Sequence, residues 1–216
     1  MELAKYIEHT LLRADAVPSD IDKLIEEAVK YGFYGICINP NLVAYARKAL
    51  EGTDVKLVTV VNFPFGINSI DATLVQTHEA LSNGADEIDI VINLMSLKSG
   101  DYKTATDEIK KVKAVCGSHT LKVILETDLL SQDEIKKACL TCITTGADFV
   151  KTSTGFVKDG VGARPEIVKL MSDTVSKRGM GVKASGGIKS KFQAIELVAA
   201  GATRLGTSCG VQIVSF

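Results

Sequence analysis

The sequence has no excess of charge of either sign and no long hydrophobic run. Its 216 residues include 25 Lys and Arg against 26 Asp and Glu, so the formal net charge is -1. A dedicated nucleic-acid binder usually carries a basic excess, so we expect no nucleic-acid partner. No apolar run approaches the roughly 20 residues that cross a bilayer. The first residues, Met1 to Tyr6, lack the charged-then-apolar order of a signal peptide. These absences predict a cytoplasmic protein with no membrane partner.

Residues that bind metals or form disulfides are few and scattered. The three histidines lie far apart and show no metal-ligand spacing, so we expect no metal site. Five cysteines form an odd, dispersed set, which is not a disulfide framework. Cys139 and Cys142 have the spacing of a redox or zinc pair. They lie inside a helical pattern over 134–145 with no second pair, and we interpret them as buried helical thiols.

The sequence does contain a regular alternation of short β-branched runs and longer amphipathic stretches. Strands are expected over six clear runs and two weaker ones, namely 35–38, 56–61, 87–92, 121–126, 148–152 and 181–185, then 8–12 and 203–207. Helices are expected from Ser19 onward and over 40–50, 68–82, 101–116, 131–145, 164–178 and 190–200.

This alternation determines the expected fold class. Alternating strands and helices give parallel strands with helices covering the sheet. Eight such units favour a compact, single-domain (β/α)8 TIM barrel over residues 1–216, with no linker to divide it. The alternative is a doubly wound open sheet, which requires that one or both weak strands do not exist.

Three charged residues occupy strand positions that face the inside of such a barrel. Alternate residues of a barrel strand face the interior, which directs Asp89, Lys151 and Lys183 into one enclosed volume. Burying an unpaired charge costs several kcal/mol, so these charges are either a structural ion pair or functional. Both lysines fall near the C-terminal ends of their strands, where barrel enzymes carry their active sites, and this favours function. By the same alternation, Lys122 and Glu126 of the fifth expected strand both face the interior, and we assign them no chemistry.

The two inward lysines suggest a specific chemistry. Adjacent strands lie about 4.8 Å apart, so the ammonium groups of Lys151 and Lys183 could approach within several ångströms. Like charges disfavour double protonation, so one lysine is expected to titrate well below about 10.4. A lysine that is neutral near pH 7 is a nucleophile that forms a Schiff base with a carbonyl substrate.

Glycine-rich turns follow the seventh and eighth strands. They are Ser185-Gly186-Gly187-Ile188 and Gly206-Thr207-Ser208-Cys209-Gly210. Barrel enzymes often bind phosphate with these two loops, where backbone N–H groups can approach an anion closely. Thr154 and Gly155, after the sixth strand, are expected to line the same end. We therefore predict a phosphate-binding end.

Nearly the whole chain resembles the deoxyribose-phosphate aldolase family, with matching segments in the same order. The most specific surrounds Lys151 and reads Phe-Val-Lys-Thr-Ser-Thr-Gly-Phe over 149–156. The others are 8–12, 37–40, 61–66, 85–93, 122–127 and 182–188.

The resemblance implies a class I aldolase that needs no metal or organic cofactor. Its substrates are a phosphosugar and aldehydes: 2-deoxy-D-ribose 5-phosphate is cleaved reversibly to acetaldehyde and D-glyceraldehyde 3-phosphate, in deoxyribose catabolism. The resemblance implies that Lys151 forms the Schiff base and that Lys183 is the cation lowering its pKa. Asp89 is the implied proton relay. Family members are dimers or tetramers, so a homo-oligomer is expected.

The resemblance also assigns the substrate pocket and exposes three departures. The residues that match phosphate-binding or pocket-lining positions are Gly186, Gly187, Gly206, Ser208, Thr10 and Cys37. Glu8 replaces the usual Asp, which puts the role of that carboxylate in doubt. Cys209 replaces a common Ser, and the chain ends without the tail tyrosine of some members.

Two other functions stay open on the sequence. One is a Schiff-base aldolase for another aldehyde or phosphosugar. The other is a non-catalytic barrel that binds sugar phosphates, against which the crowded trio of Asp89, Lys151 and Lys183 argues.

Overall fold

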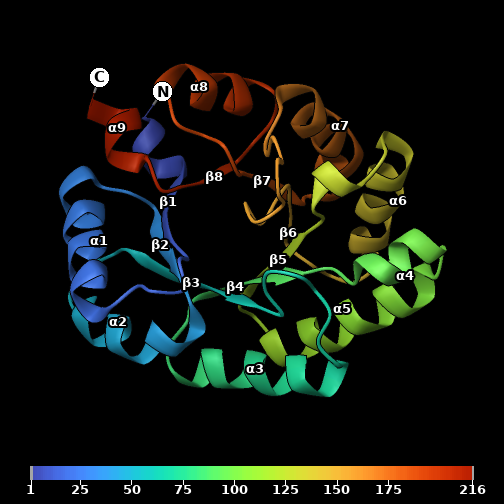
Figure 1. Cartoon of the computed structure of the whole chain (residues 1–216), viewed down its shortest axis with the longest axis horizontal. Helices are drawn as coiled ribbons and strands as arrows, with labels where there is room; N and C mark the ends of the chain where they lie inside the picture. Colours follow the sequence, from blue (N-terminus) through green and yellow to red (C-terminus); the bar gives the residue numbers. More distant parts are fainter. Residues whose placement is uncertain (1, 216) are drawn as a thin grey trace.

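The computed structural model describes residues 2–215. Within them, eight parallel strands close into a barrel in chain order, with β1 paired to β8. Figure 1 shows the strands at the centre and the helices arranged around them. The predicted (β/α)8 barrel is confirmed, and the open-sheet alternative is wrong. The expectations that concern Met1 and the chain end at Phe216 fall on residues outside those described.

The strands are β1 (Ile7–Leu11), β2 (Gly35–Ile38), β3 (Lys56–Val61), β4 (Glu87–Val91), β5 (Thr120–Ile124), β6 (Phe149–Lys151), β7 (Gly181–Ser185) and β8 (Arg204–Thr207). The α-helices are α1 (Pro18–Tyr31), α2 (Val43–Ala49), α3 (Ile70–Ser82), α4 (Leu94–Ser99), α5 (Tyr102–Cys116), α6 (Gln132–Ile143), α7 (Pro165–Val175), α8 (Lys191–Ala199) and α9 (Gly210–Ser215). Short 3-10 turns are η1 (Leu3–Tyr6), η2 (Pro40–Leu42), η3 (Thr127–Leu129) and η4 (Ser176–Arg178).

The expected strands end within two residues of the observed ones. Helices α4 and α9 were not expected, because six residues are too few to display a helical repeat. Local sequence explains several helix ends. Ser131 accepts from the Glu134 backbone while the Glu134 carboxylate accepts from the Ser131 N–H, which starts α6. Gly32 ends α1 in the left-handed region, at φ +65°.

The strands separate two apolar regions of very different size. The large cluster lies between the barrel and the surrounding helices and includes Ile88 and Ile90 of β4. The small cluster inside the barrel consists of Cys37, Val58 and Val60. Charged groups take much of the remaining interior. No helix among residues 2–215 is long and apolar enough to cross a membrane.

Candidate active site

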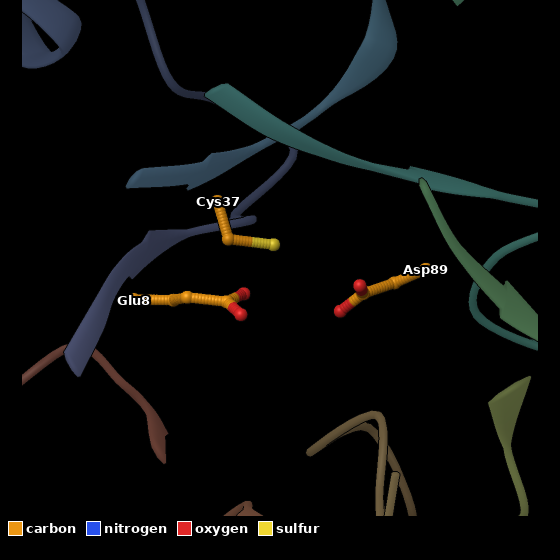
Figure 2. A group of neighbouring side chains, drawn as sticks. All are labelled: Glu8, Cys37 and Asp89. Atoms are coloured by element: carbon orange, nitrogen blue, oxygen red, sulfur yellow. The ribbon is translucent and has the colours of Figure 1, made fainter. Parts of the chain in front are cut away.

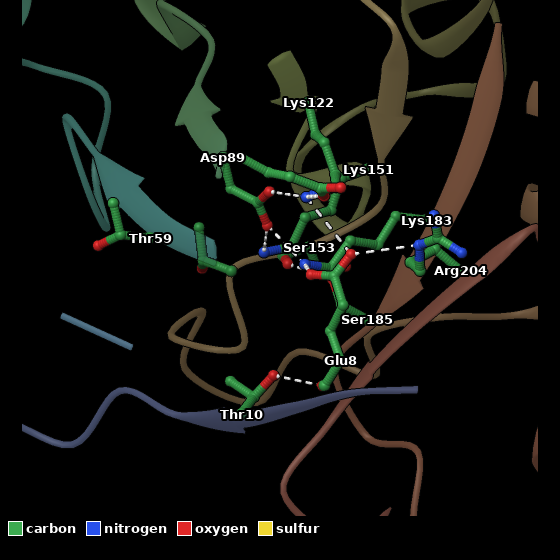
Figure 3. Close-up of polar contacts among 12 residues, drawn as sticks. Glu8, Thr10, Thr59, Asp89, Lys122, Lys151, Ser153, Lys183, Ser185 and Arg204 are labelled. Atoms are coloured by element: carbon green, nitrogen blue, oxygen red, sulfur yellow. Dashed lines mark hydrogen bonds and ion pairs between the residues drawn. The ribbon is translucent and has the colours of Figure 1, made fainter. Parts of the chain in front are cut away.

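The barrel interior contains a carboxylate surrounded by three ammonium groups (Figure 3). One Asp89 oxygen, Oδ2, accepts from the Nζ of Lys151 at 2.8 Å and from the Nζ of Lys183 at 2.6 Å. The other oxygen, Oδ1, accepts from the Nζ of Lys122 at 2.9 Å. All four side chains are buried. The predicted convergence of Asp89, Lys151 and Lys183 is observed, and Lys122 joins it.

Strand register produces this cluster. Asp89 of β4 lies opposite Lys122 of β5, and Lys151 of β6 lies opposite Lys183 of β7. Side chains at paired positions of neighbouring strands point to the same face of the sheet. The closed barrel then brings the two pairs together across its interior.

Two more carboxylates complete the cluster. Glu8 pairs with Lys183 and lies 3.3 Å from the Nζ of Lys122. Glu87 lies 2.6 Å from the same Lys122 nitrogen. The interior therefore holds three carboxylates and three ammonium groups, all buried. Neither Glu8 nor Lys122 had a role assigned from the sequence.

An aromatic–cation stack lies beside this cluster. The guanidinium of Arg204 lies over the ring of Tyr34, 3.4 Å from the ring centroid, and its Nε is 3.6 Å from Glu8. The Tyr34 hydroxyl donates to Glu87. Burial and this neighbouring carboxylate raise the pKa of Tyr34 to about 12. The tyrosine therefore stays a neutral donor at physiological pH.

Opposing charges decide the ionisation of the central groups. Burial alone would raise the pKa of Asp89, but Lys122, Lys151 and Lys183 outweigh it and hold that pKa well below its usual range. Burial alone would lower the pKa of Lys183, but Asp89 and Glu8 outweigh it and raise that pKa. The same balance, with Asp89 foremost among the carboxylates, raises the pKa of Lys122. Lys183 is therefore not the lysine with a lowered pKa. The expectation that one of the two inward lysines has a lowered pKa stays a prediction.

Glu8, Cys37 and Asp89 form a compact trio on the inner wall (Figure 2). One ligand-type atom from each lies within 4.8 Å of the others, a spacing compatible with a metal ion. However, lysine ammonium groups already pair with both carboxylates. Burial raises the pKa of the Cys37 thiol, which keeps it protonated and a poor ligand. The donor set therefore suits the lysines better than a metal.

A cavity of about 580 Å³ opens above the cluster. Lys151 lines it, whereas Asp89 and Lys183 lie deeper, fully buried. Cys37 was expected to line the substrate pocket, but it is fully buried against Val58 and Val60 and is not among the residues that line this cavity. The other expected substrate-binding residues all line it: Thr10, Thr154, Gly155, Gly186, Gly187, Gly206, Thr207 and Ser208. Arg13 and Lys189, which the sequence analysis did not single out, line it too.

Several hydroxyls of the cavity wall already have partners within the chain. Thr207 donates to the carbonyl of Ile188 at 2.7 Å and accepts from the Cys209 N–H at 2.9 Å. The Thr154 hydroxyl donates to Glu126. The Thr10 hydroxyl donates to the carbonyl of Glu8 at 2.9 Å. These hydroxyls therefore hold the loops in place, and Gly186, Gly187 and Gly206 line the cavity beside them.

The cysteine pair of α6 is confirmed as buried. Cys139 and Cys142 are free thiols that belong to the large apolar cluster. Burial raises the pKa of Cys139 to about 12 and raises that of Cys142 as well. Such thiols are unreactive at neutral pH.

Comparison with known proteins identifies relatives over nearly the full length. A family model described as DeoC/LacD family aldolase matches residues 3–215. A deoxyribose-phosphate aldolase of Streptococcus equi subsp. zooepidemicus is 51% identical over 214 residues, covering 99% of this chain and 96% of the relative. One from Clostridium botulinum strain Langeland is 50% identical over 214 residues, covering 99% of this chain and 100% of the relative.

Solved structures agree with the sequence relatives. An aldolase named QR15 superimposes with a TM-score of 0.93 at 38% identity, covering 99% of this chain and 94% of that chain. A tetrameric deoxyribose phosphate aldolase from Aeropyrum pernix superimposes with a TM-score of 0.89 at 34% identity, covering 98% and 88%.

Proposed function

The chain belongs to the DeoC/LacD family of aldolases, and from this premise we propose that it cleaves 2-deoxy-D-ribose 5-phosphate through a Schiff base on Lys151. The products are acetaldehyde and D-glyceraldehyde 3-phosphate, and the reaction is reversible. The proposal draws on the names of the relatives and on the geometry beneath the cavity.

One observation carries the assignment of the nucleophile. The charge cluster contains three lysines, but only Lys151 lines the cavity, and its side chain is 4% exposed. The side chains of Lys122 and Lys183 are 0% exposed. A substrate carbonyl that enters the cavity meets Lys151 first, which suits the nucleophilic role.

The reaction follows from amine and carbonyl chemistry. The neutral amine of Lys151 attacks the C1 aldehyde of the open-chain sugar, and the carbinolamine loses water to give an iminium. The electron pair of the C2–C3 bond then moves toward nitrogen and forms an enamine. The C3 hydroxyl loses its proton and becomes the aldehyde of glyceraldehyde 3-phosphate. Protonation of the enamine at C2 and addition of water release acetaldehyde and restore the amine.

Asp89 and Lys183 support these steps by their charge and placement. The Oδ2 of Asp89 bonds both ammonium groups, so it can accept and return a proton as the carbinolamine forms and dehydrates. The raised pKa of Lys183 keeps it charged at neutral pH. A permanent cation near Lys151 favours the neutral, nucleophilic form of that amine.

The phosphate is proposed to lie against the glycine loops after β7 and β8. Gly186, Gly187 and Gly206 line the cavity together with Lys151. Backbone N–H groups can approach an anion closely where no side chain intervenes. Arg13 and Lys189 line the same cavity and add cationic side chains to it, although the Arg13 guanidinium also pairs with Asp15 and Asp20. Loops that bind a phosphate would favour a phosphosugar over an unphosphorylated sugar as substrate.

Borohydride trapping tests the nucleophile. Incubation with deoxyribose 5-phosphate and borohydride is expected to reduce the iminium and to leave a stable adduct on Lys151, located by peptide mapping. Lys151→Met is the matched variant and should give no adduct. An adduct on a different lysine, or active enzyme without any adduct, would contradict the assignment.

The pH dependence of Lys183→Leu tests the electrostatic role. Removing the neighbouring cation disfavours the neutral amine, so the acid limb of the kcat/KM profile should move to higher pH. The folded state of the variant is checked by circular dichroism. An unmoved limb in a folded variant would show that Lys183 does not act through its charge.

Two alternatives are separated by substrate comparison. An aldolase for another aldehyde or phosphosugar would prefer deoxyribose 5-phosphate over ribose 5-phosphate by less than about tenfold in kcat/KM. A non-catalytic barrel would bind the phosphosugar without turnover. The three ammonium groups around Asp89 favour the enzyme, because binding alone does not require them.

Assembly and location complete the proposal. The tetrameric aldolase of Aeropyrum pernix is a structural relative of this chain, and a homodimer or homotetramer is proposed here. Light scattering would measure the oligomeric state. A cytoplasmic location agrees with a small phosphorylated substrate, and cell fractionation would test it.

A further inference from the structure

The loop after β6 contacts the glycine loop after β7 at two places. The Ser185 hydroxyl donates to the carbonyl of Ser153 at 2.6 Å, and further along the two loops meet through their backbones. The N–H of Ala163 donates to the carbonyl oxygen of Gly186 at 3.0 Å. Gly162 has a φ of +80°, and a Cβ placed on it would lie 2.4 Å from that same oxygen. No side chain fits between the two segments. Gly162 is therefore one of the contacts that set the position of Gly186 in the cavity wall, beside the bonds that hold Ser185.

Gly162 is itself held by Asp128, which lies in the 3-10 turn after β5. Its Oδ2 accepts from the Gly162 N–H at 2.7 Å, and its side chain is only 10% exposed. Asp128 does not line the 580 Å³ cavity. It lines a separate space of about 60 Å³ behind the glycine loop, bounded also by Gly162, Gly186 and Gly187. Asp128 thus lies behind the wall formed by Gly186 and Gly187, on the side away from the 580 Å³ cavity.

Glu126 supports the neighbouring wall from the same segment. It has a φ of +57°, in the left-handed region that a glutamate rarely adopts. Its buried carboxylate accepts from the N–H of Thr154 at 3.1 Å and from the Thr154 hydroxyl. One short segment, 126–128, therefore holds both Thr154 and Gly162. Both carboxylates of this segment thus bond residues of the next loop.

We infer that Asp128 is a positioning residue that sets the preference for phosphorylated sugars, by holding Gly162 and through it Gly186 and Gly187. This inference rests on the proposed function. Charge alone predicts the opposite sign, because a carboxylate near a phosphate repels it and its removal should tighten binding. The two explanations can therefore be separated by experiment.

The test compares deoxyribose 5-phosphate with unphosphorylated deoxyribose as substrates of wild type, Asp128→Ala and Asp128→Asn. Asp128→Ala removes the acceptor for the Gly162 N–H, so KM for the phosphorylated sugar should rise about tenfold. The kcat/KM for unphosphorylated deoxyribose should stay unchanged. Asp128→Asn keeps an oxygen acceptor without the charge and should restore most of the lost preference.

Two further variants complete the design. Glu166→Ala is the matched control. Both Glu166 and Asp128 lie near Arg164, at 4.0 Å and 3.6 Å, but no bond joins Glu166 to Gly162 among the described residues. It should behave as wild type. Gly162→Ala reaches the same loop independently, since its Cβ would collide with the backbone of Gly186. It should weaken binding of the phosphorylated sugar as Asp128→Ala does, even if Asp128→Ala fails to fold.

The outcomes distinguish the two levels of the proposal. A wild-type enzyme without preference for the phosphorylated sugar would overturn the proposed function and this inference with it. A wild type that prefers the phosphorylated sugar, with Asp128→Ala equally selective, would overturn the inference alone. Tighter phosphosugar binding in both Asp128→Ala and Asp128→Asn would show that charge, not position, is what Asp128 contributes.

Discussion

The two faces of the barrel strands have opposite chemistry. On β4, Ile88 and Ile90 face outward into the large apolar cluster, while Glu87 and Asp89 face the interior and pair with lysines. The same alternation separates Val150 from Lys151 on β6. Because side chains alternate along a strand, one short segment can serve a hydrocarbon layer and a charge cluster at once. Alternate residues of one strand thus contribute either to the apolar layer that stabilises the fold or to the charge cluster of the site.

The two faces also differ in energetic terms. Burying a Leu, Ile or Val side chain stabilises the fold by about 1.5–3 kcal/mol. Removing a charge from water costs several kcal/mol per ion, and pairing at best offsets that cost. The outer layer therefore supplies the stability on which the interior cluster depends. Substitutions on the two faces should accordingly have different signatures.

The largest effect is expected for Lys122→Met. It removes the lysine that contacts Glu87, Asp89 and Glu8, and it leaves the buried Glu87 without a lysine partner. Breaking a buried pair in this way costs about 3–5 kcal/mol. Chemical denaturation measures the change in the free energy of unfolding. Lys103→Met, which removes an exposed ion pair with Asp107, is the matched control and should change it little. Equal effects of the two substitutions would mean that the interior cluster behaves like the surface.

A somewhat smaller effect is expected for Ile88→Ala in the outer layer. Truncating this fully buried side chain should cost about 2–4 kcal/mol through lost burial and the cavity left behind. Because Ile88 points away from the charge cluster, the pH–rate profile of the folded variant should match wild type. Denaturation and kinetics below the melting temperature measure both quantities. A shifted profile would show that the two faces are coupled through the strand.

The smallest effect is expected in the alkaline range, where both regions contribute. The raised pKa of Cys142 means that the unfolded thiol ionises first, so stability should fall as pH rises above about 8.5. The raised pKa of Lys183 has the same sign, but its loss should begin only above about 10.4. Each group contributes a slope of up to about 1.4 kcal/mol per pH unit.

Variants separate the two alkaline phases. Cys142→Ala should reduce the earlier loss, and Lys183→Leu should reduce only the later one. Unfolding free energies measured from pH 7 to pH 11 decide this. A single phase that neither variant alters would contradict the assignment to these groups.

Much of this architecture could be predicted from the sequence because it is local. Strand–helix alternation predicts the barrel, and parity along a strand predicts the inward placement of Asp89, Lys151 and Lys183. Helices α4 and α9 were missed because each is too short to show a period. The glycine loops could be assigned to the cavity since their order after β7 and β8 fixes which end they occupy.

The remaining features depend on contacts that close the barrel. Glu8 reaches Lys183 because β1 pairs with β8, a contact between the two ends of the chain. The sequence showed two crowded lysines but not the second carboxylate beside them, so the direction of the pKa change for Lys183 was not foreseen. Lys122 shows inward parity in the sequence, but its contact with Asp89 depends on the β4–β5 register.

The equal numbers of buried carboxylates and ammonium groups bear on the proposed reaction cycle. An iminium on Lys151 carries the same single positive charge as the ammonium it replaces. The cluster therefore carries the same charge with a protonated Lys151 as in the covalent intermediate. Groups that stabilise the ammonium form by their charge also stabilise the iminium, with little rearrangement. Rigid strands, rather than mobile loops, are then a suitable place for the charged groups.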